Sequence, residues 1–302
     1  MSGDRLLESD LPARSRPVDE VQVQLAFAAD ASGRTWLARQ RVAYPFHVGR
    51  CLSLAGDPPG MATVYVQCCS GGLFEGDAVK ARVECGPGTR AQVTTSASTI
   101  VHSMEAGEAS QAVEIDTEAA SALEYLPEPL ILFPAARLTN CVRIRLHEAA
   151  TVLVSDATLT HDPGGTGRRF DRLSNELVVE SSAGRLLARD RWIMTGTVVE
   201  RAVPGITGAY RCQGSFLVLR QGLSDLRLLD EVRAGLNERP GIHAGASHLP
   251  NGCGIIVRLL STDAAALKGA LRGARCAARR VLWGSEAGAP SATDDRGRPS
   301  TR

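Results

Sequence analysis

The segment CCSGGLFEGD, residues 68–77, carries the residue types that most readily suggest chemistry in this chain of 302 residues. Two adjacent cysteines could bind a soft metal ion, and the glycines could hold a phosphate against backbone N–H groups. Glu75 and Asp77 could supply acid–base chemistry. The flanking residues alternate in polarity as strands do, so a plain strand connection is a further interpretation.

A phosphate-binding loop is excluded by the residues that follow the glycines. Such loops read G-x-x-x-x-G-K-[ST], or G-x-G-x-x-G at the start of a helix. SGGLFEGD matches neither pattern, and the next residues, AVKARVEC, alternate like a strand. Gly71, Gly72 and Gly76 are instead typical of a tight connection with positive φ, in which Asp77 accepts hydrogen bonds from nearby backbone N–H groups.

No catalytic constellation is recognisable elsewhere. The chain lacks the nucleophile motif G-x-S-x-G and the zinc-binding motif H-E-x-x-H. The six histidines are scattered, and for each of them a structural or surface role is favoured over metal binding. Cys68 and Cys69 point to opposite faces of a strand end, so they are poorly placed to bind one ion together, although one of them could face an internal cavity.

Two further polar segments each leave two interpretations open. The hydroxyl-rich run VTTSAST, which contains Thr94 and Thr95, could be an exposed sheet face or the wall of a wet internal passage. The segment EYLPEP, residues 124–129, is held extended by its two prolines and suits either a rim or an interface.

Short alternating runs rich in β-branched residues predict a strand-rich protein. Ten such runs are expected to be strands: 21–27, 63–69, 77–85, 90–96, 111–116, 140–146, 151–156, 176–181, 215–220 and 254–260.

Two segments have the period of a helix instead. The first begins at Ser224 as N-cap and ends at Pro240-Gly241; the second begins at Ser261 or Thr262. Each has one apolar stripe that is expected to face inward: Leu226, Leu229, Val232 and Leu236 in the first, and Ala264, Leu267, Leu271, Ala274 and Ala278 in the second. The arginine-rich face of the second helix (Arg272, Arg275, Arg279, Arg280) is interpreted as solvated.

A repeat of about 30 residues indicates how the strands are arranged. Small or turn residues precede a strand at Thr89, Ala120 and Ala150, which are 31 and 30 residues apart, and a fourth copy follows about 34 residues later. Repeating units of this kind bury their apolar faces against their neighbours. The sequence therefore predicts a mainly β fold, an elongated β-helix-like stack of strands with two packing α-helices.

Composition limits the location and the partners. The 34 basic and 33 acidic residues give a net charge of +1, which provides no general attraction for nucleic acid or an anionic membrane. No signal peptide or membrane-spanning segment is recognisable, so a cytoplasmic protein with reduced cysteines is expected. We expect a polar lead-in at residues 1–20, a single domain at 21–283 and a disordered tail at 284–302.

Taken in order, the motifs resemble the UreD family of urease accessory proteins, also called UreH. The matching segments are YPFHVGR (44–50), SGGLFEGD (70–77), GPGTRAQVTTSAST (86–99), EYLPEP with LILFPAAR (124–137) and VSDATLT (154–160). The resemblance extends from about residue 20 to about residue 283. Each motif alone is weak, but the ordered set is specific.

This resemblance implies a role without catalysis of its own. Proteins of the family bind the urease apoprotein and the accessory protein UreF, which recruits the GTPase UreG, and Ni²⁺ is thought to reach urease through a passage inside UreD. The resemblance therefore implies no tightly bound cofactor, transient Ni²⁺, and GTP only on the partner GTPase. Neither nucleic acid nor a membrane is an expected partner.

The resemblance also supplies candidate residues. Those expected at the passage or its turns are Gly71, Gly72, Gly76, Asp77, Thr94, Thr95, Glu124 and Asp156. His102 and Cys68 are candidate metal contacts, because they stand where the family more often has other residues: Cys68-Cys69-Ser70 replaces His-Pro-Pro, and Ile100 and His102 replace a lysine and a tyrosine.

Two alternatives to the metallochaperone scaffold remain. A hydrolase or lyase on a β-solenoid would use a carboxylate cluster such as Glu75, Asp77 and Glu84, although the separation of Asp77 and Glu84 argues against it. A purely structural interaction module would bind the same partners without metal transit.

Overall fold

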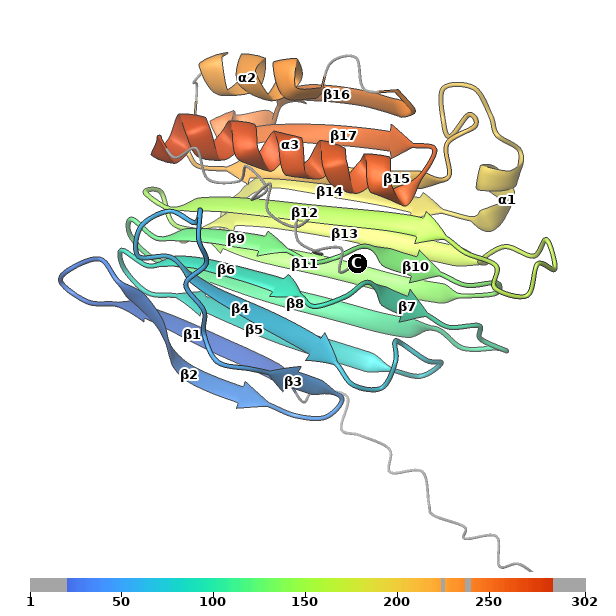
Figure 1. Cartoon of the computed structure of the whole chain (residues 1–302), viewed down its shortest axis with the longest axis horizontal. Coiled ribbons are helices and arrows are strands. Elements are labelled where there is room, and N and C mark those ends of the chain that lie inside the picture. Colours follow the sequence, from blue (N-terminus) through green and yellow to red (C-terminus); the bar gives the residue numbers. More distant parts are fainter. Residues whose placement is uncertain (1–20, 224–225, 237–239, 285–302) are drawn as a thin grey trace, which may run out of the picture.

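Two β-sheets face each other in the computed structural model, which describes residues 21–223, 226–236 and 240–284 (Figure 1). The first sheet has seven strands in the order β14 (Leu186–Met194), β13 (Arg172–Ser181), β11 (Arg137–Leu146), β8 (Ala109–Thr117), β5 (Ala78–Cys85), β1 (Val23–Ala29) and β2 (Thr35–Val42). We call it sheet A. It forms the rear layer in Figure 1.

Sheet B, the front layer, has ten strands within the described part of the chain. Its main order is β16 (Ile242–His248), β17 (Gly254–Ser261), β15 (Cys212–Leu219), β12 (Thr151–Thr160), β9 (Ala122–Leu126), β6 (Arg90–Thr95), β4 (Ala62–Cys68) and β3 (Phe46–Val48). The two short strands β7 (Thr99–Val101) and β10 (Leu130–Leu132) pair in parallel with each other, and β10 also pairs with β12.

The chain coils between the sheets and so builds the predicted stack. It passes from β4 to β5, from β6 through β7 to β8, from β9 through β10 to β11, and from β12 to β13, and equivalent strands of successive coils pair in parallel. Antiparallel strands complete both ends of the stack: β1 with β2 and β3 with β4 at one end, and β14, β15, β17 and β16 at the other. The prediction of a mainly β, β-helix-like fold is confirmed.

The predicted repeat was nearly right in its register. Ala91 pairs with Leu123, and Leu123 pairs with Val152, so the true offsets are 32 and 29 residues. Ser121, not Ala120, precedes the middle strand at the equivalent position, because the first of these coils has the longer connection. The proposed fourth copy, residues 181–190, is no coil at all but the antiparallel hairpin between β13 and β14.

Alternation along the strands divides the apolar side chains between two main cores. In β12, Val152 and Val154 point between the sheets, whereas Leu153 and Ala157 point to the outer face of sheet B. Each fully buried aliphatic side chain contributes about 1.5–3 kcal/mol of transfer free energy. A register slip of one residue would exchange the two faces, so these two cores fix the strand pairing.

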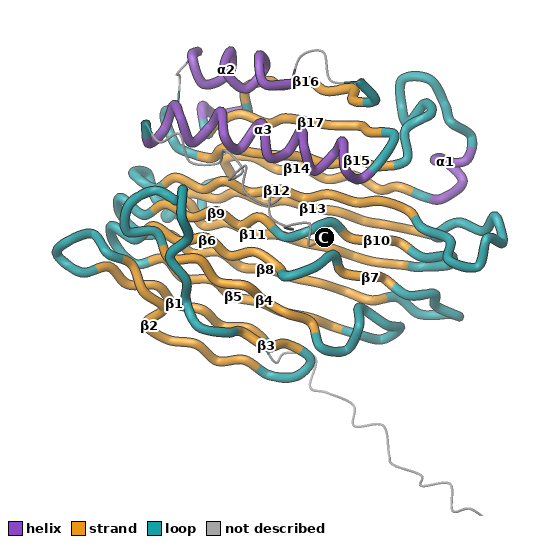
Figure 2. The backbone as a smooth tube through the Cα atoms, viewed as in Figure 1, coloured by secondary structure: helices purple, strands orange, loops and turns teal. Residues whose placement is uncertain are grey.

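Two helices cover the outer face of sheet B at its C-terminal end: α2 (Leu226–Leu236) lies beside β16, and α3 (Ala264–Trp283) lies across β15 and β17 (Figure 1). Figure 2 shows that the remaining helical segments, α1 (Gly196–Glu200) and the 3₁₀ turn η1 (Pro250–Gly252), are short pieces in connections. The two predicted packing helices are therefore present. No helix of the described residues has the length and apolar character needed to cross a bilayer.

Several details of the helices differ from expectation. Leu226 is exposed, and Leu228 takes its place in the buried stripe. The N-cap of α3 is Asp263, whose Oδ1 accepts from the N–H of Ala266 at 2.8 Å, and not Ser261 or Thr262. The expected cap Ser224 and the two ends of the chain, residues 1–20 and 285–302, lie outside the described residues.

Candidate functional site

A cavity of about 280 Å³ lies between the two sheets, on the side of the stack where β7 and β10 run. Its walls are mainly the aliphatic residues of both inner faces, including Val66, Val93 and Val142. Polar residues enter these faces where the apolar alternation of the strands is interrupted. On sheet A they are Gln111, Asn140 and Asn175; on sheet B they are Thr95, Asp156 and Thr158, while Thr94 and Ser155 also line the cavity although alternation points their side chains to the outer face.

The three amide side chains of sheet A stand in one row across neighbouring strands. Asn140 of β11 is paired in register with Gln111 of β8 on one side and with Asn175 of β13 on the other. The Nδ2 of Asn140 donates to Oδ1 of Asn175 at 2.6 Å. Parallel, in-register strands stack equal positions above one another, so a single polar position in each coil becomes a continuous polar row.

Asp156 joins this row from the opposite sheet. Its Oδ2 accepts from Nδ2 of Asn175 at 2.8 Å, and its Oδ1 accepts from the N–H of Ser215 at 3.0 Å. Burial raises the pKa of Asp156, and the hydrogen bonds from Asn175 and Ser215 partly offset that rise. Asp156 is thus a buried acidic group in the interior of the stack.

A second cavity, of about 340 Å³, begins on the other side of Asp156. It is lined by residues of β14, β15, β16 and β17, and it shares Asp156 and Trp192 with the first cavity. Its charged lining residue Arg258 is paired with Asp190, with 2.5 Å between Nη2 and Oδ1. Asp156 therefore lines both the cavity between the sheets and a pocket whose lining includes the exposed residues Ile206, His243 and Arg258.

The turn CCSGGLFEGD lies at the edge of the first cavity. Cys68, Gly71 and Gly72 line it, and the Sγ of Cys68 lies 3.2 Å from Oγ of Ser70. Gly72 has φ 143°, and a Cβ there would overlap the carbonyl oxygen of Ile100 in β7. A glycine is required at this position by close backbone approach as well as by φ.

Asp77 and Glu75 stabilise the same turn from its outer side. Oδ2 of Asp77 accepts from the N–H of Phe74 at 2.8 Å, as predicted for a turn aspartate. The carboxylate of Glu75 accepts from the backbone N–H groups of residues 105–107, and these bonds lower its pKa. Gly76 has φ 81° in the same connection. The two carboxylates hold loops together rather than facing a common cleft.

His102 packs against this turn without entering the cavity lining. Its ring stacks on Phe74 with 4.2 Å between ring centroids, and its Nε2 lies 3.2 Å from the carbonyl oxygen of Gly71. The ring of His102 also makes an edge contact with Phe133, and the ring of Phe133 contacts that of His161. These contacts make His102 a stacked ring at the end of the coils, close to the cavity edge but oriented by aromatic packing.

The paired threonines lie on the cavity wall. Oγ1 of Thr94 donates to the carbonyl oxygen of Leu126 at 2.6 Å. Oγ1 of Thr95 donates to the carbonyl oxygen of Ala97 at 3.0 Å and accepts from the N–H of Glu128 at 2.9 Å. Each hydroxyl therefore fastens the EYLPEP segment or its neighbouring turn, and lines the cavity as it does so.

Glu124 does not face the cavity. Alternation along β9 points it to the outer face of sheet B, under α3, while its neighbour Tyr125 lines the cavity. Its carboxylate accepts from Nη2 of Arg279 and from Nε of Arg275, each at 2.8 Å, and Arg279 also reaches Asp57 at 3.1 Å. Glu124 is a buried anchor for α3, which corrects its expected position on a passage.

The same contacts correct the interpretation of the arginine-rich face. Arg279 is only 2% exposed, and burial alone would lower its pKa, but the hydrogen bonds and charges of Glu124 and Asp57 raise the pKa overall. Only Arg272 and Arg280 of the four arginines are exposed, and Arg280 pairs with Glu231 of α2. Two of the four face inward because the carboxylates beneath α3 attract them.

The cysteines are separate from one another, and none of the eight, all of which fall within the described ranges, forms a disulfide. Burial raises the pKa of Cys85 to about 12 and that of Cys212 to about 11. A thiol with so high a pKa is a poor metal ligand near neutral pH.

Of the predicted site residues, Gly71, Gly72, Thr94, Thr95, Asp156 and Cys68 line the first cavity; Gly76, Asp77, Glu124 and His102 are not among the described residues that line it. Sequence reasoning missed the row Gln111, Asn140 and Asn175. The available signal was an amide at an inward position of each of three strands, which becomes visible only when the strand pairing is known.

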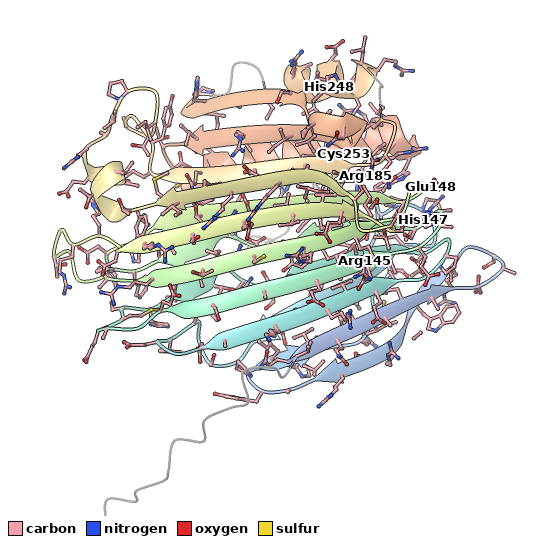
Figure 3. The ribbon with its side chains drawn as sticks, turned by 180° about the vertical axis from the view of Figure 1, so that it is seen from behind. Arg145, His147, Glu148, Arg185, His248 and Cys253 are labelled. Atoms are coloured by element: carbon pink, nitrogen blue, oxygen red, sulfur yellow. The ribbon has the colours of Figure 1, made fainter. Side chains whose placement is uncertain are left out.

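Figure 3 shows a second group of titratable side chains, at the opposite end of the coils from β7 and β10. It comes from the ends of β11 and β16 and from the connections β11–β12, β13–β14 and β16–β17: Arg145, His147, Glu148, Arg185, His248 and Cys253. Nδ1 of His147 accepts from the N–H of Ala149 at 3.2 Å, so it is engaged in its own turn. Across all described residues, no group of three or more His, Cys, Asp or Glu side chains could hold a metal ion.

Comparison with known proteins gives consistent matches over nearly the whole chain. Residues 20–293 match the family described as UreD urease accessory protein. The curated protein "Urease accessory protein UreD 1" of Pseudomonas syringae pv. syringae is 42% identical over 277 residues, which is 92% of this chain and 96% of that protein. Its namesake from Methylorubrum populi is 36% identical over 88% of this chain and 91% of its own length, and "Urease accessory protein UreD 2" of Streptomyces griseus is 33% identical over 92% and 95%.

Proposed function

Because the chain belongs to the UreD family of urease accessory proteins, we propose that it is a non-enzymatic chaperone and scaffold for the insertion of nickel into apo-urease. In this proposal it works in the cytoplasm, binds the urease apoprotein and UreF, and through UreF the GTPase UreG. It holds no resident cofactor; Ni²⁺ is cargo, and GTP belongs to the partner.

The observation that carries the proposal is the cavity between the sheets, which shares Asp156 and Trp192 with a neighbouring pocket beside β15, β16 and β17. A conduit must bind an ion weakly enough to release it, whereas a storage site encloses the ion with several strong ligands. Aliphatic walls with isolated hydroxyl, amide and carboxylate groups match the first requirement.

Docking of partner proteins is supported by apolar side chains on the surface. Within the described part of the chain, eight large hydrophobic residues are more than a third exposed: Trp36, Tyr44, Leu54, Phe74, Leu186, Ile193, Ile206 and Leu226. Exposed apolar surface of this kind commonly marks interaction sites. It does not by itself assign a particular partner to a particular face.

A solenoid hydrolase or lyase gains no support from the geometry. Glu75 and Asp77 are bound to loop N–H groups, and Glu84 pairs with Arg39 at 2.6 Å on the outer face of sheet A. An acid–base pair needs two carboxyl groups that converge on one substrate position. These three groups do not converge.

The experiment that tests the proposal combines assembly with activation. Thr95→Trp would fill the first cavity, and Gln67→Trp would add the same bulk to an exposed position on β4. We expect both variants to co-purify with urease, UreF and UreG, and only Thr95→Trp to leave urease without nickel and inactive. Equal activation by both variants would show that the chain acts as a structural interaction module without metal transit. Failure of the unchanged chain to bind any of the three partners would overturn the proposal.

A further inference from the structure

Sheet A ends earlier than sheet B at the C-terminal end of the stack. Its last strand, β14, pairs with β13 alone within the described part of the chain, whereas sheet B continues beyond β12 through β15, β17 and β16. Figure 3, in which sheet A lies in front, shows orange strands of sheet B beyond the edge at the yellow β14. The inward side of β16 is therefore open, and its residues His243, Gly245 and Ser247 are exposed.

The free side of β14 offers unpaired backbone groups. The N–H of Arg172 in β13 donates to the carbonyl oxygen of Ala136, on the side of β11, so the odd-numbered residues of β13 are those that hydrogen-bond to β14. These residues lie opposite even-numbered residues of β14, as Asn175 lies opposite Trp192. Three residues of β14 therefore direct their N–H and C=O groups to the free side: Arg189, Arg191 and Ile193.

Apolar side chains are exposed along the same edge. Leu186 and Ile193 of β14 are 51% and 52% exposed, and Ile206 in the β14–β15 connection is 54% exposed. An edge strand with unpaired backbone groups and exposed apolar side chains is a template for pairing with another chain, and proteins usually cover it. Among the described residues, Asn251 covers only the start of this edge, through a hydrogen bond from its Nδ2 to the carbonyl oxygen of Leu187 at 2.7 Å.

The second cavity lies directly beside this edge. Its volume is about 340 Å³; β14 contributes Trp192 and Met194 to its wall, and the open strands of sheet B contribute Gly245 and Leu260. A cavity of about 150 Å³ is already large enough for a benzene ring. Because side chains alternate along a strand, every second residue of a strand added at β14 would point to this side, where a large apolar side chain fits.

The charges at the edge indicate which strand fits. Arg189 and Arg191 point to the outer face of sheet A, where Arg189 pairs with Glu176 and Arg191 has no ion pair or hydrogen bond from its side chain to any described residue. A second copy of this chain fits poorly, because full antiparallel overlap of two β14 strands, centred on Asp190, places Arg189 opposite Arg191 twice. Like charges directly opposite each other destabilise a strand pair, whereas an acidic side chain opposite Arg191 is complementary.

We propose that β14 is a docking edge to which a partner protein adds one extended strand, with an acidic residue opposite Arg191 and an apolar residue in the second cavity. Strand addition obtains its affinity from main-chain hydrogen bonds and its specificity from alternate side chains. The proposal rests on the proposed function, because it specifies how one of the partner proteins docks. It involves no step of ion transfer.

The first experiment measures amide hydrogen exchange in the purified full chain, alone and with the urease apoprotein or UreF as the probe. We expect one of the two complexes to slow exchange at Arg189, Arg191 and Ile193 about tenfold or more, because main-chain hydrogen bonds protect amides. The amides of β2, the opposite edge of sheet A, are the control and should change by about twofold or less. Unchanged exchange at β14 in both complexes would overturn the proposal. So would protection of these amides in the chain alone, which would mean that the chain itself or a second copy covers the edge.

Two substitutions at Arg191 separate backbone pairing from charge. Arg191→Thr removes the charge and keeps the N–H on the free side, so we expect a loss of about two- to fivefold in affinity for the partner. Arg191→Pro also removes that N–H and leaves the hydrogen bonds to β13 intact, so we expect a loss of about thirtyfold or more. Equal losses in the two variants would show that only the charge is recognised, which would overturn strand addition.

A matched pair of glycine substitutions tests the second cavity. Gly245 lines it, and Gly49 follows β3 at the other edge of sheet B; at both positions a Cβ would meet no atom within 4 Å, and neither has a positive φ. Gly245→Phe fills the cavity with a side chain of this protein, so we expect partner binding to weaken about tenfold. Gly49→Phe should bind within about twofold of the unchanged chain. Equal binding by the two variants would overturn the placement of a partner side chain in the cavity.

The outcomes separate the docking edge from the proposed function. If Arg191→Pro binds the partners and activates urease like the unchanged chain, the docking edge is wrong and the function stands. If a partner protects β14 and Arg191→Pro abolishes this, but urease is never activated, the docking edge stands and the function is wrong. Should Arg191→Pro fail to fold, hydrogen exchange of the unchanged chain and the glycine pair decide the matter without it.

Discussion

At the scale of single residues, the most consequential finding is that a side chain's face on its strand decides its role. Glu124 and Asp156 were both expected on a passage, yet the first is buried under α3 and the second stands between two cavities. Their side chains point to opposite faces of sheet B. It follows from strand alternation and not from residue type.

The buried ion pairs of Glu124 give a first prediction. Arg279→Leu leaves the fully buried Glu124 with Arg275 alone and removes the partner of Asp57, so we expect a loss of about 3–5 kcal/mol in the free energy of unfolding. Urea denaturation measures it. The matched control is Arg272→Leu, on the exposed side of the same helix, which should change stability by about 0.5 kcal/mol or less.

Thiol reactivity gives a second prediction. Burial raises the pKa of Cys85 to about 12, so at pH 8 only about one molecule in ten thousand carries the reactive thiolate there. Cys69 is exposed. In the native protein we expect a thiol reagent to modify Cys69 first and Cys85 only after unfolding, as peptide mass mapping would show. Early modification of Cys85 would mean that the inter-sheet core opens readily.

At the scale of elements, the turn between β4 and β5 shows how the coil is closed. Gly71 and Gly72 both have positive φ, but a Cβ at Gly71 would meet open space, whereas at Gly72 it would strike the backbone of β7. The turn therefore sets the position of β7, and through it the edge of the first cavity. Gly71 is therefore required by its positive φ alone, whereas Gly72 is required by its positive φ and by its close approach to β7.

Alanine substitutions separate these causes, which is a third prediction. Gly71→Ala should cost about 1–2 kcal/mol, the strain of a left-handed alanine. Gly72→Ala adds a backbone clash that only a shift of β7 can relieve, and we expect about 3 kcal/mol or more, since overpacking adds a further 1–3 kcal/mol. Thermal unfolding of the pair measures the difference. Equal losses would show that β7 moves freely.

The sequence predicted those strands whose residue pattern is contained within the strand itself. All ten predicted strands exist, because each carries β-branched residues in alternation. The three-residue strands β3, β7 and β10 were missed since three residues show no period, and β2 and β16 were missed because their polar faces hide the alternation. The amide row of Asn140 and Asn175 depends on which strands pair, and pairing is not a local property.

At the scale of the whole molecule, the sandwich and its helices form one folding unit with three apolar cores. The second core exists only because α2 and α3 cover sheet B, where Phe216, Val218 and Val257 would otherwise face water. The helices are therefore part of the fold and not an appendage. The single domain of residues 21–283 stays a prediction.

Truncation tests that boundary, and is the fourth prediction. A chain of residues 21–284 should keep the melting temperature of the full chain within a few degrees, because it retains every described element. A chain ending at residue 262 loses α3, which uncovers the apolar outer face of sheet B and removes both arginine partners of Glu124. We expect it to lose cooperative unfolding and to bind a hydrophobic dye. A cooperative transition in the shorter chain would contradict the role given to α3.

The parallel stacking of coils bears on how such a protein can change over evolutionary time. One complete additional coil would lengthen both sheets by a strand spacing of about 4.8 Å and would keep every neighbouring register intact. A single residue inserted within a strand would instead turn its whole inner face outward. Offsets of 32 and 29 residues between equivalent strands show that the connections absorb the length differences. This architecture therefore tolerates a change of length in a connection, or by one whole coil, and does not tolerate one within a strand.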